Sequence, residues 1–305
     1  MATVTEVENN TAATFADSAL NEYGPIRRMV VRHARDAYLG QAVLDDRWEV
    51  EEFLGSPDFN EALAEYDSFL QATTDAGIEP EFVPADERNG VSAIYVRDSA
   101  LISRHGAILC AMRNAHRAPE PAVANDDFAR LGVPVVGAVT GTGLIEGGDF
   151  IWLDENTCAV ADGYRTNPEG IRQLGALLDP DVHIEVAQLP HGDGPGACLH
   201  LMSLISPLDA NLALVYSKLM PVRFRQWLLD RGTVFVEVPD DEYEPTMGCN
   251  VLALGPRKCL ALDGNPVTRR RMEAAGCDVV TYKGSEISFK GGGGPTCLTR
   301  PLIRG

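Results

Sequence analysis

The chain has 305 residues, of which 45% are hydrophobic and 23% are charged, a composition typical of a globular protein that buries a large core. Its formal net charge of −18 opposes binding to nucleic acid or to an anionic membrane surface. No apolar run approaches the roughly 20 residues that span a bilayer, so we expect neither nucleic acid nor a membrane as a partner.

The first 22 residues are polar and acidic, and they lack both the basic region and the apolar core of a secretory signal. They predict a flexible leader, 1–22, in front of a single catalytic domain, 23–305, and a cytoplasmic location. The seven cysteines include no CxxC pair. We therefore expect reduced thiols, no metal and no other cofactor.

Five helical patterns follow one another along the chain, and each ends at a Gly or Asp turn before a β-rich segment. The helical patterns cover 62–77, 126–132, 168–179, 222–232 and 268–276, and the β-rich segments cover 80–84, 133–139, 182–189, 233–239 and 277–282. Hairpin patterns lie between them, with turns centred near residues 105, 155, 208 and 256. A recurrence of about 50 residues indicates an internal repeat.

The fifth unit, 283–305, offers only one hairpin strand, but the segment 25–33 near the start of the chain is equally rich in β-forming residues. Pairing these two strands would close the repeats into a ring without an open edge. We therefore predict an α/β fold with a single domain, a five-fold pseudo-symmetric α/β propeller. The alternative is a doubly wound α/β sheet, but regular hairpins and the lack of a nucleotide-binding motif disfavour it.

Reactive side chains stand where successive hairpins begin. They are Asp98 in the first unit, Glu146 and Asp149 in the second, His200 in the third, Asn250 in the fourth and Cys297 in the fifth. A pseudo-rotation that relates the units would gather them into one pocket. A thiolate, an imidazole and several carboxylates suit nucleophilic attack on a planar cationic carbon, with paired N–H···O contacts that hold a guanidinium.

Cys297 and His200 are the candidates for the nucleophile and the acid/base residue. Cys297 follows Gly291–Gly294, where backbone without side chains allows close approach and can turn amides toward an anionic sulfur. A cysteine is more often an inert buried residue, and we interpret the other six in that way. His200, between apolar neighbours, would alone be a core histidine, but its position at a hairpin start favours acid/base chemistry.

Five motifs in order resemble the guanidine-modifying superfamily with the pentein fold. They are YVRD (95–98), IEGGDF (145–150), YRTNPEG (164–170), LHLMS (199–203) and GGGGPTCLTRPL (291–302). The superfamily includes dimethylarginine dimethylaminohydrolases, arginine deiminases and glycine amidinotransferases, and CLTRPL with the RTN segment is most similar to the first of these. The resemblance implies that Cys297 forms a covalent thiouronium intermediate. It also implies that His200 is oriented by Glu146, that Asp98 holds the guanidinium and that Arg165 holds a substrate carboxylate.

Three positions depart from these patterns. Met202 stands where deiminases and amidinotransferases carry an Asp, while Ser92 and Arg97 stand where dimethylaminohydrolases usually carry acids. A thioether cannot accept the N–H donors of unmodified arginine, but it can pack against an N-alkyl substituent.

We predict a cysteine-dependent hydrolase of an Nω-substituted arginine or related small guanidine, which gives a ureido product such as citrulline and an amine. The predicted substrate-binding residues are Asp98, Arg165, Asp149, Asn250, Met202 and Arg97. Alternatives within enzymes are an arginine deiminase or an amidinotransferase, depending on whether water or an amine takes over the intermediate. An alternative of another class is a pentein that binds a metabolite without turnover, and a homo-oligomer is compatible with each of these.

Overall fold

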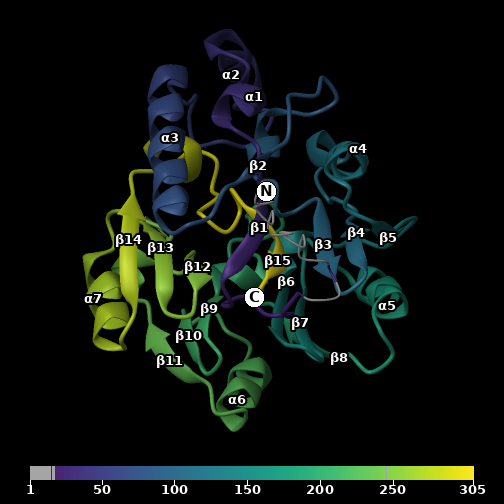
Figure 1. Cartoon of the computed structure of the whole chain (residues 1–305), viewed down its shortest axis with the longest axis vertical. Coiled ribbons are helices and arrows are strands. Elements are labelled where there is room, and N and C mark those ends of the chain that lie inside the picture. Colours follow the sequence, from purple (N-terminus) through teal and green to yellow (C-terminus); the bar gives the residue numbers. More distant parts are fainter. Residues whose placement is uncertain (1–14, 16–17, 245) are drawn as a thin grey trace, which may run out of the picture.

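The computed structural model describes residues 15, 18–244 and 246–305. Within these residues the chain forms five three-stranded sheets, which lie around a common centre (Figure 1). Each sheet holds an antiparallel pair of strands and a third strand that is parallel to one of them. This is the predicted five-bladed α/β propeller, and the doubly wound alternative is wrong because the sheets are separate.

Four blades are built from consecutive hairpins and the crossover helices that follow them. The hairpins are β3 (Ala100–Ser103) with β4 (Gly106–Leu109), β6 (Phe150–Asp154) with β7 (Thr157–Asp162), β9 (Ile205–Asp209) with β10 (Leu212–Val215), and β12 (Leu252–Gly255) with β13 (Lys258–Leu262). The helices are α4 (Glu120–Leu131), α5 (Pro168–Leu177), α6 (Val222–Asp230) and α7 (Pro266–Ala274), and the parallel strands are β5 (Val135–Ala138), β8 (His183–Gln188), β11 (Val234–Glu237) and β14 (Asp278–Tyr282). A parallel pair needs such a crossover, which explains why helix and strand patterns alternate in the sequence.

The third hairpin turns slightly later than we predicted. Strand β9 continues through Pro207 to Asp209, and the carboxylate of Asp209 accepts a hydrogen bond from the backbone N–H of Ala210 at 2.8 Å. The turn therefore lies at residues 210–211 rather than near 208. An Asp that hydrogen-bonds the following backbone is a common turn device, and here it outweighs the proline as a signal.

The fifth blade joins the two ends of the sequence, as predicted. Strand β1 (Ile26–Val31) pairs antiparallel with β15 (Arg300–Arg304), with Ile26 opposite Arg304, and parallel with β2 (Glu81–Phe82). The helix α3 (Phe59–Asp75) precedes β2, and Asp58 is its N-cap, because the Asp58 carboxylate accepts from the N–H of Glu61. Two short helices that the sequence patterns did not reveal, α1 (Ala34–Tyr38) and α2 (Gln41–Arg47), lie between β1 and α3.

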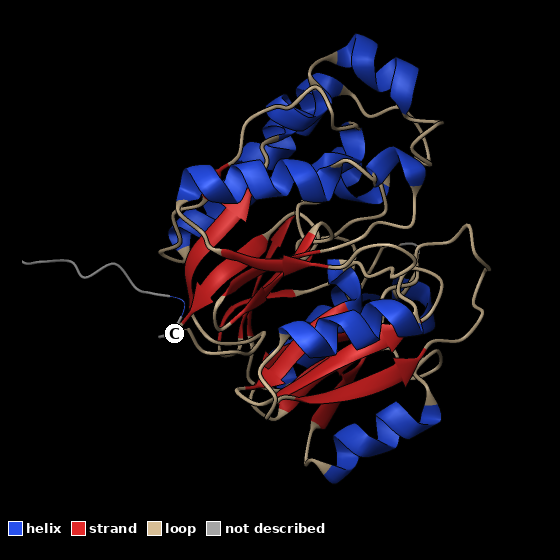
Figure 2. Ribbon diagram, turned by 90° about the vertical axis from the view of Figure 1, so that its right-hand side faces the viewer, coloured by secondary structure: helices blue, strands red, loops and turns tan. Residues whose placement is uncertain are grey.

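Strands occupy the interior of the molecule and helices flank them (Figure 2). The strand β10, for example, is buried along its whole length, and Phe224 and Leu228 of α6 belong to the same apolar cluster. None of the helices in the described part of the chain has the length and the apolar content needed to cross a bilayer.

Most of the predicted leader, residues 1–14 and 16–17, lies outside the described residues. Residues 18–22 are packed against the last strand, since the N–H of Ala19 donates to the carbonyl of Arg304 at 3.0 Å and Leu20 is 3% exposed. The packed body of the protein therefore begins before residue 23.

Candidate active site

A cavity with about 410 Å³ of space is lined by residues from every blade. The cavity is lined by four of the side chains that the hairpin register predicts to converge, Asp98, His200, Asn250 and Cys297. Arg165 and Met202 line it as well. Asp98, His200 and Asn250 each stand shortly before the first strand of a hairpin, and Cys297 stands shortly before β15. The repeated architecture thus brings residues from distant parts of the sequence to one cavity.

The two glycines of the EGGD motif allow close contact between blades. A Cβ atom at Gly148 would lie 2.4 Å from Nδ1 of His200, and one at Gly147 would lie 2.1 Å from the carbonyl oxygen of Arg97. Neither distance is possible between non-bonded atoms, so only glycine fits at these positions. The motif therefore brings the backbone at Gly148 directly against the histidine.

His200 and Glu146 form a buried pair. Nε2 of His200 lies 2.9 Å from Oε2 of Glu146, and the two side chains are 5% and 0% exposed. Burial alone would lower the pKa of His200, but the nearby Cys198, Asp149 and Asp98 raise it well above its ordinary value. Burial would raise the pKa of Glu146, but the hydrogen bond and the charge of His200 hold it below its ordinary value. The pair therefore favours an imidazolium beside a carboxylate.

The other ring nitrogen of His200 points away from Glu146. Nδ1 lies 4.0 Å from Oδ1 of Asp98 and 3.6 Å from the sulfur of Cys198. We interpreted Cys198 from the sequence as an inert buried thiol, and this was wrong, because the residue is exposed and lines the cavity. The glycine-rich segment before it carries no periodic signal from which this position could have been predicted.

Cys297 is held by Asn250. The sulfur lies 3.5 Å from Nδ2 of Asn250, and Oδ1 of Asn250 accepts from the backbone N–H and the hydroxyl of Thr296 at 3.1 and 2.8 Å. Burial raises the pKa of the Cys297 thiol and Asp98 raises it further, while His200 lowers it, and the net shift is upward. Without a cation in the cavity the thiol form is therefore favoured.

Asp98 is part of a buried ion-pair network. Its Oδ2 accepts from Nη1 of Arg117 at 2.7 Å, and its Oδ1 accepts from the N–H of Gly148 at 3.1 Å. Arg117 also donates to both oxygens of Glu120, at 2.7 and 2.9 Å. Burial would raise the pKa of Asp98, but Arg117 and His200 lower it overall, so the group is ionised. The sequence patterns did not reveal Arg117, which ends a short 3-10 helix, Ala115–Arg117.

Arg165 and Met202 lie where the sequence predicts. Nη1 of Arg165 is 3.3 Å from Oε2 of Glu146, and its Nε has no hydrogen-bond partner among the described residues. Met202 is 4% exposed and presents its side chain to the cavity. Arg165 and Met202 therefore add a cation and an apolar side chain to the cavity that Asp98 also lines.

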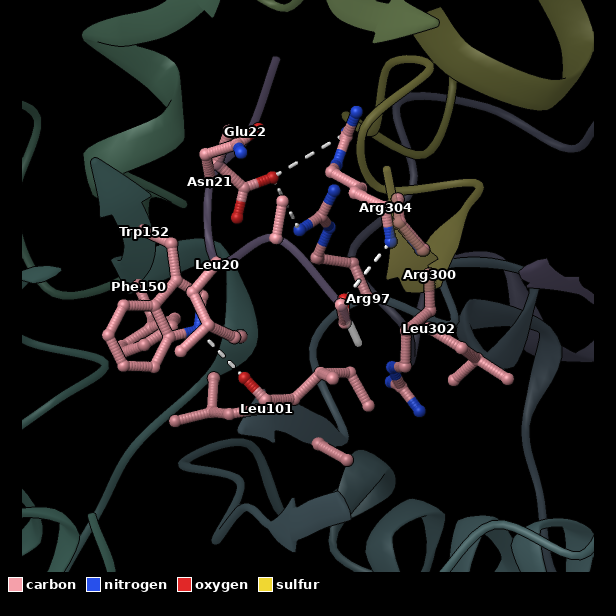
Figure 3. A pocket seen from close by; sticks show the side chains of 16 residues that line it. Leu20, Asn21, Glu22, Arg97, Leu101, Phe150, Trp152, Arg300, Leu302 and Arg304 are labelled. Carbon is pink, nitrogen blue, oxygen red and sulfur yellow. Dashed lines mark hydrogen bonds and ion pairs between the residues drawn. The ribbon is translucent and has the colours of Figure 1, made fainter. Parts of the chain in front are cut away.

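Two predicted substrate-binding residues do not line the cavity. Asp149 is fully buried behind His200, where its oxygens accept from the N–H of Leu201 at 3.0 Å and from the hydroxyl of Thr166 at 2.7 Å, and burial raises its pKa to about 6. Arg97 lines a separate small pocket (Figure 3), because it and the adjacent Asp98 leave a turn of the backbone in different directions. For both residues the position corrects the prediction.

Comparison with known proteins places these features in context. The family model described as arginine deiminase matches residues 91–234 and 221–304. The uncharacterized protein YkgA of Bacillus subtilis is 29% identical over 242 residues, which are 79% of this chain and 80% of that protein. An arginine deiminase of Mycobacterium avium is 28% identical over 191 residues, 53% of this chain, so the chain matches 47% of that enzyme's length.

Among solved structures, a mutant of DDAH from Pseudomonas aeruginosa complexed with citrulline superimposes with a TM-score of 0.72. The two chains share 21% sequence identity, and the match covers 92% of this chain and all of the other. At this identity the likeness establishes the shared fold.

Proposed function

The chain belongs to the arginine deiminase family, and from this premise we propose that it is a hydrolase that cleaves a C–N bond of a small guanidine. The observation that carries the proposal is the buried contact between His200 and Glu146 in the wall of a cavity that also holds Cys297 and Asp98. These groups can supply a nucleophile, a proton and a counter-charge for a cationic substrate.

The raised pKa of Cys297 has a direct consequence for the first step. Burial raises the pKa of Cys297 because it removes water from around the thiolate. A guanidinium that binds beside the sulfur supplies an opposite charge in place of that water, and this favours the thiolate. The thiol then loses its proton to solvent, so the nucleophile forms when the substrate is in place. The thiolate attacks the guanidinium carbon, and a C–S bond forms as the carbon becomes tetrahedral.

The second ring nitrogen of His200 faces the cavity and can move the protons. The imidazolium gives its proton to the departing nitrogen, the C–N bond breaks, and the amine leaves a thiouronium on Cys297. Neutral His200 then takes a proton from water while the oxygen attacks the same carbon. Cleavage of the C–S bond returns the thiolate, and the hydroxyl proton passes to solvent as the carbonyl of the ureido product forms.

Asp98 and Arg165 are the groups we assign to substrate binding. Each oxygen of Asp98 already accepts one hydrogen bond, from Arg117 or Gly148, and a carboxylate oxygen has a second acceptor position for a guanidinium N–H. Arg165 lines the same cavity, and its guanidinium suits a substrate carboxylate. Met202 provides an apolar contact in place of a second acid, so we propose an Nω-substituted arginine or a similar alkylated guanidine as the substrate.

A panel of substrates tests the proposal. The protein is incubated with arginine, monomethylarginine, dimethylarginine, agmatine and other guanidines, and the ureido product is measured, with Cys297→Ser as the inactive control. We expect product from at least one alkylated guanidine and, in a quenched reaction, a mass increase on the Cys297 peptide. Absence of ureido product from every compound would show that the proposed substrate class is wrong.

A further inference from the structure

The segment 18–24, which we call the N-terminal strap, covers a small cavity of about 40 Å³ that is separate from the active-site cavity. The hydroxyl of Ser18 accepts from the N–H of Arg304 at 3.1 Å, and the N–H of Leu20 donates to Oε1 of Glu155 at 3.1 Å. These contacts tie the strap to the last strand and to the second blade. Figure 3 shows its acidic residue, Glu22, lying between Arg97 and Arg304.

Glu22 is the counter-charge for two buried arginines. Its Oε2 lies 3.4 Å from Nη1 of Arg97 and 3.9 Å from Nη2 of Arg304, and the three side chains are 10%, 9% and 4% exposed. Of the described residues that line this small cavity, Glu22 is the one with a carboxylate. Its loss would leave two desolvated guanidinium groups without an acid, a costly arrangement that favours movement of a side chain.

Arg97 connects this charge cluster to the nucleophile. Its Nε donates to the carbonyl of Thr296 at 3.1 Å, and its backbone N–H donates to the carbonyl of Cys297 at 3.2 Å. Thr296 is also held by Asn250 through its N–H and hydroxyl. The turn that carries Cys297 is therefore fixed by Asn250 and, through a different atom of Thr296, by Arg97.

We infer that Glu22 and Arg97 are positioning residues for the nucleophile. The strap carboxylate holds the guanidinium of Arg97 in one orientation, and that guanidinium holds the carbonyl of Thr296. Without Glu22 the long side chain of Arg97 regains its rotamer freedom, and the Cys297 sulfur loses its fixed place beside Asn250. This inference rests on the proposed role of Cys297 and adds a part of the chain far from the cavity to it.

Alkylation of Cys297 tests the inference without a substrate. The rate of iodoacetamide labelling is measured against pH by mass spectrometry of the Cys297 peptide, for wild type, Glu22→Ala and Arg97→Lys. We expect Glu22→Ala to label about tenfold more slowly near neutral pH, with its midpoint at higher pH, because the thiolate loses the donor from Asn250 and the nearby imidazolium. Arg97→Lys keeps the charge but loses the Nε donor, and we expect the same direction.

Chemical rescue separates the missing carboxylate from general damage. Formate or acetate should enter the space left in Glu22→Ala and restore the wild-type labelling profile at least in part, but it should not restore Arg97→Lys. Glu155→Ala is the matched control, because it removes the acceptor of the Leu20 N–H and so loosens the same strap without touching Arg97, and its profile should stay that of the wild type. Circular dichroism establishes that each variant is folded, and Glu22→Gln replaces Glu22→Ala if the latter is not.

The results distinguish the two proposals. If no guanidine of the panel gives ureido product with the wild type, the proposed function fails. If the wild type turns over and the Glu22 variants and Arg97→Lys keep its labelling profile, the positioning role is wrong and the proposed function stands. Equal slowing by Glu155→Ala, or no effect of formate on Glu22→Ala, would also overturn the inference.

Discussion

Replacement of Glu146 by Gln should make turnover fail earlier as the pH rises. Gln has nearly the same size and can still accept from Nε2 of His200, now 2.9 Å from Oε2 of Glu146, but it carries no charge. A hydrogen bond to a charged group contributes about 1.5–3 kcal/mol and a neutral one about 0.5–1.5 kcal/mol. The imidazolium thus loses about 1–2 kcal/mol, a factor of about 5–30 in its protonation equilibrium.

The assay is the pH dependence of kcat/KM between pH 6 and 10 with the guanidine that gives the most product. Because the departing amine needs a proton from His200, the alkaline limb of the Glu146→Gln profile should lie at lower pH than that of the wild type. At a pH on the alkaline limb of both profiles, the variant should be about 5–30 times slower. An unchanged alkaline limb, with rates within twofold, would refute the idea that Glu146 holds the proton on His200.

The same pair sets a window of stability. Folding lowers the pKa of Glu146 below its ordinary 4.5, so this contribution is present above about pH 4.5 and is lost as the pH falls through the folded value. Folding raises the pKa of His200 above its ordinary 6.5, so that contribution is fully present below about pH 6.5 and is lost as the pH rises through the folded value. The difference in unfolding free energy between wild type and Glu146→Gln should therefore be largest between about pH 4.5 and 6.5.

Three further predictions concern Asp149, Gly148 and Met202. Burial raises the pKa of Asp149 from 3.8 to about 6, so the wild type should lose unfolding free energy as the pH rises through this range. Urea titrations at pH 4 and pH 8 should show this loss in the wild type but not in Asp149→Asn. Equal losses in the two proteins would contradict the prediction. A methyl group at Gly148 would lie 2.4 Å from His200, so Gly148→Ala should lower kcat by more than about tenfold. Gly55→Ala is the control, because a Cβ there meets nothing within 4 Å, and its kcat should stay that of the wild type. Equal activities of the two variants would disprove the contact. Met202→Ala should reduce kcat/KM about tenfold more for an N-alkylated guanidine than for arginine, and equal reductions would mean that Met202 does not contact the alkyl group.

The fold could be predicted because its parts are local. Each hairpin has its turn signal within a few residues, as at 154–156, and each crossover helix ends just before the strand it leads to. The repeat then supplied the long-range information, since a common register implies a common place in the ring. The short helices α1 and α2 were not predicted, because each is too short to show the hydrophobic period of a helix.

The candidate site was predictable only as far as this register reached. It brought Asp98, His200, Asn250 and Cys297 together, but it could not give the direction of Arg97 or the depth of Asp149, which depend on how neighbouring blades pack. Arg117 stands in a 3-10 helix of one turn and Cys198 in a loop, and neither segment shows a sequence pattern that gives its position. Their contacts with Asp98 and His200 come from the tertiary structure alone.

Closure of the ring by β1 and β15 has a consequence for biosynthesis. Four blades can form as soon as their own segments leave the ribosome, whereas Ile26 must wait for Arg304, which is made after all four of them. Such a pairing between distant parts of the chain is slow to form and leaves a strand edge exposed meanwhile. Because Cys297 arrives with that final strand, a nascent chain holds the histidine and the carboxylates but not yet the thiol.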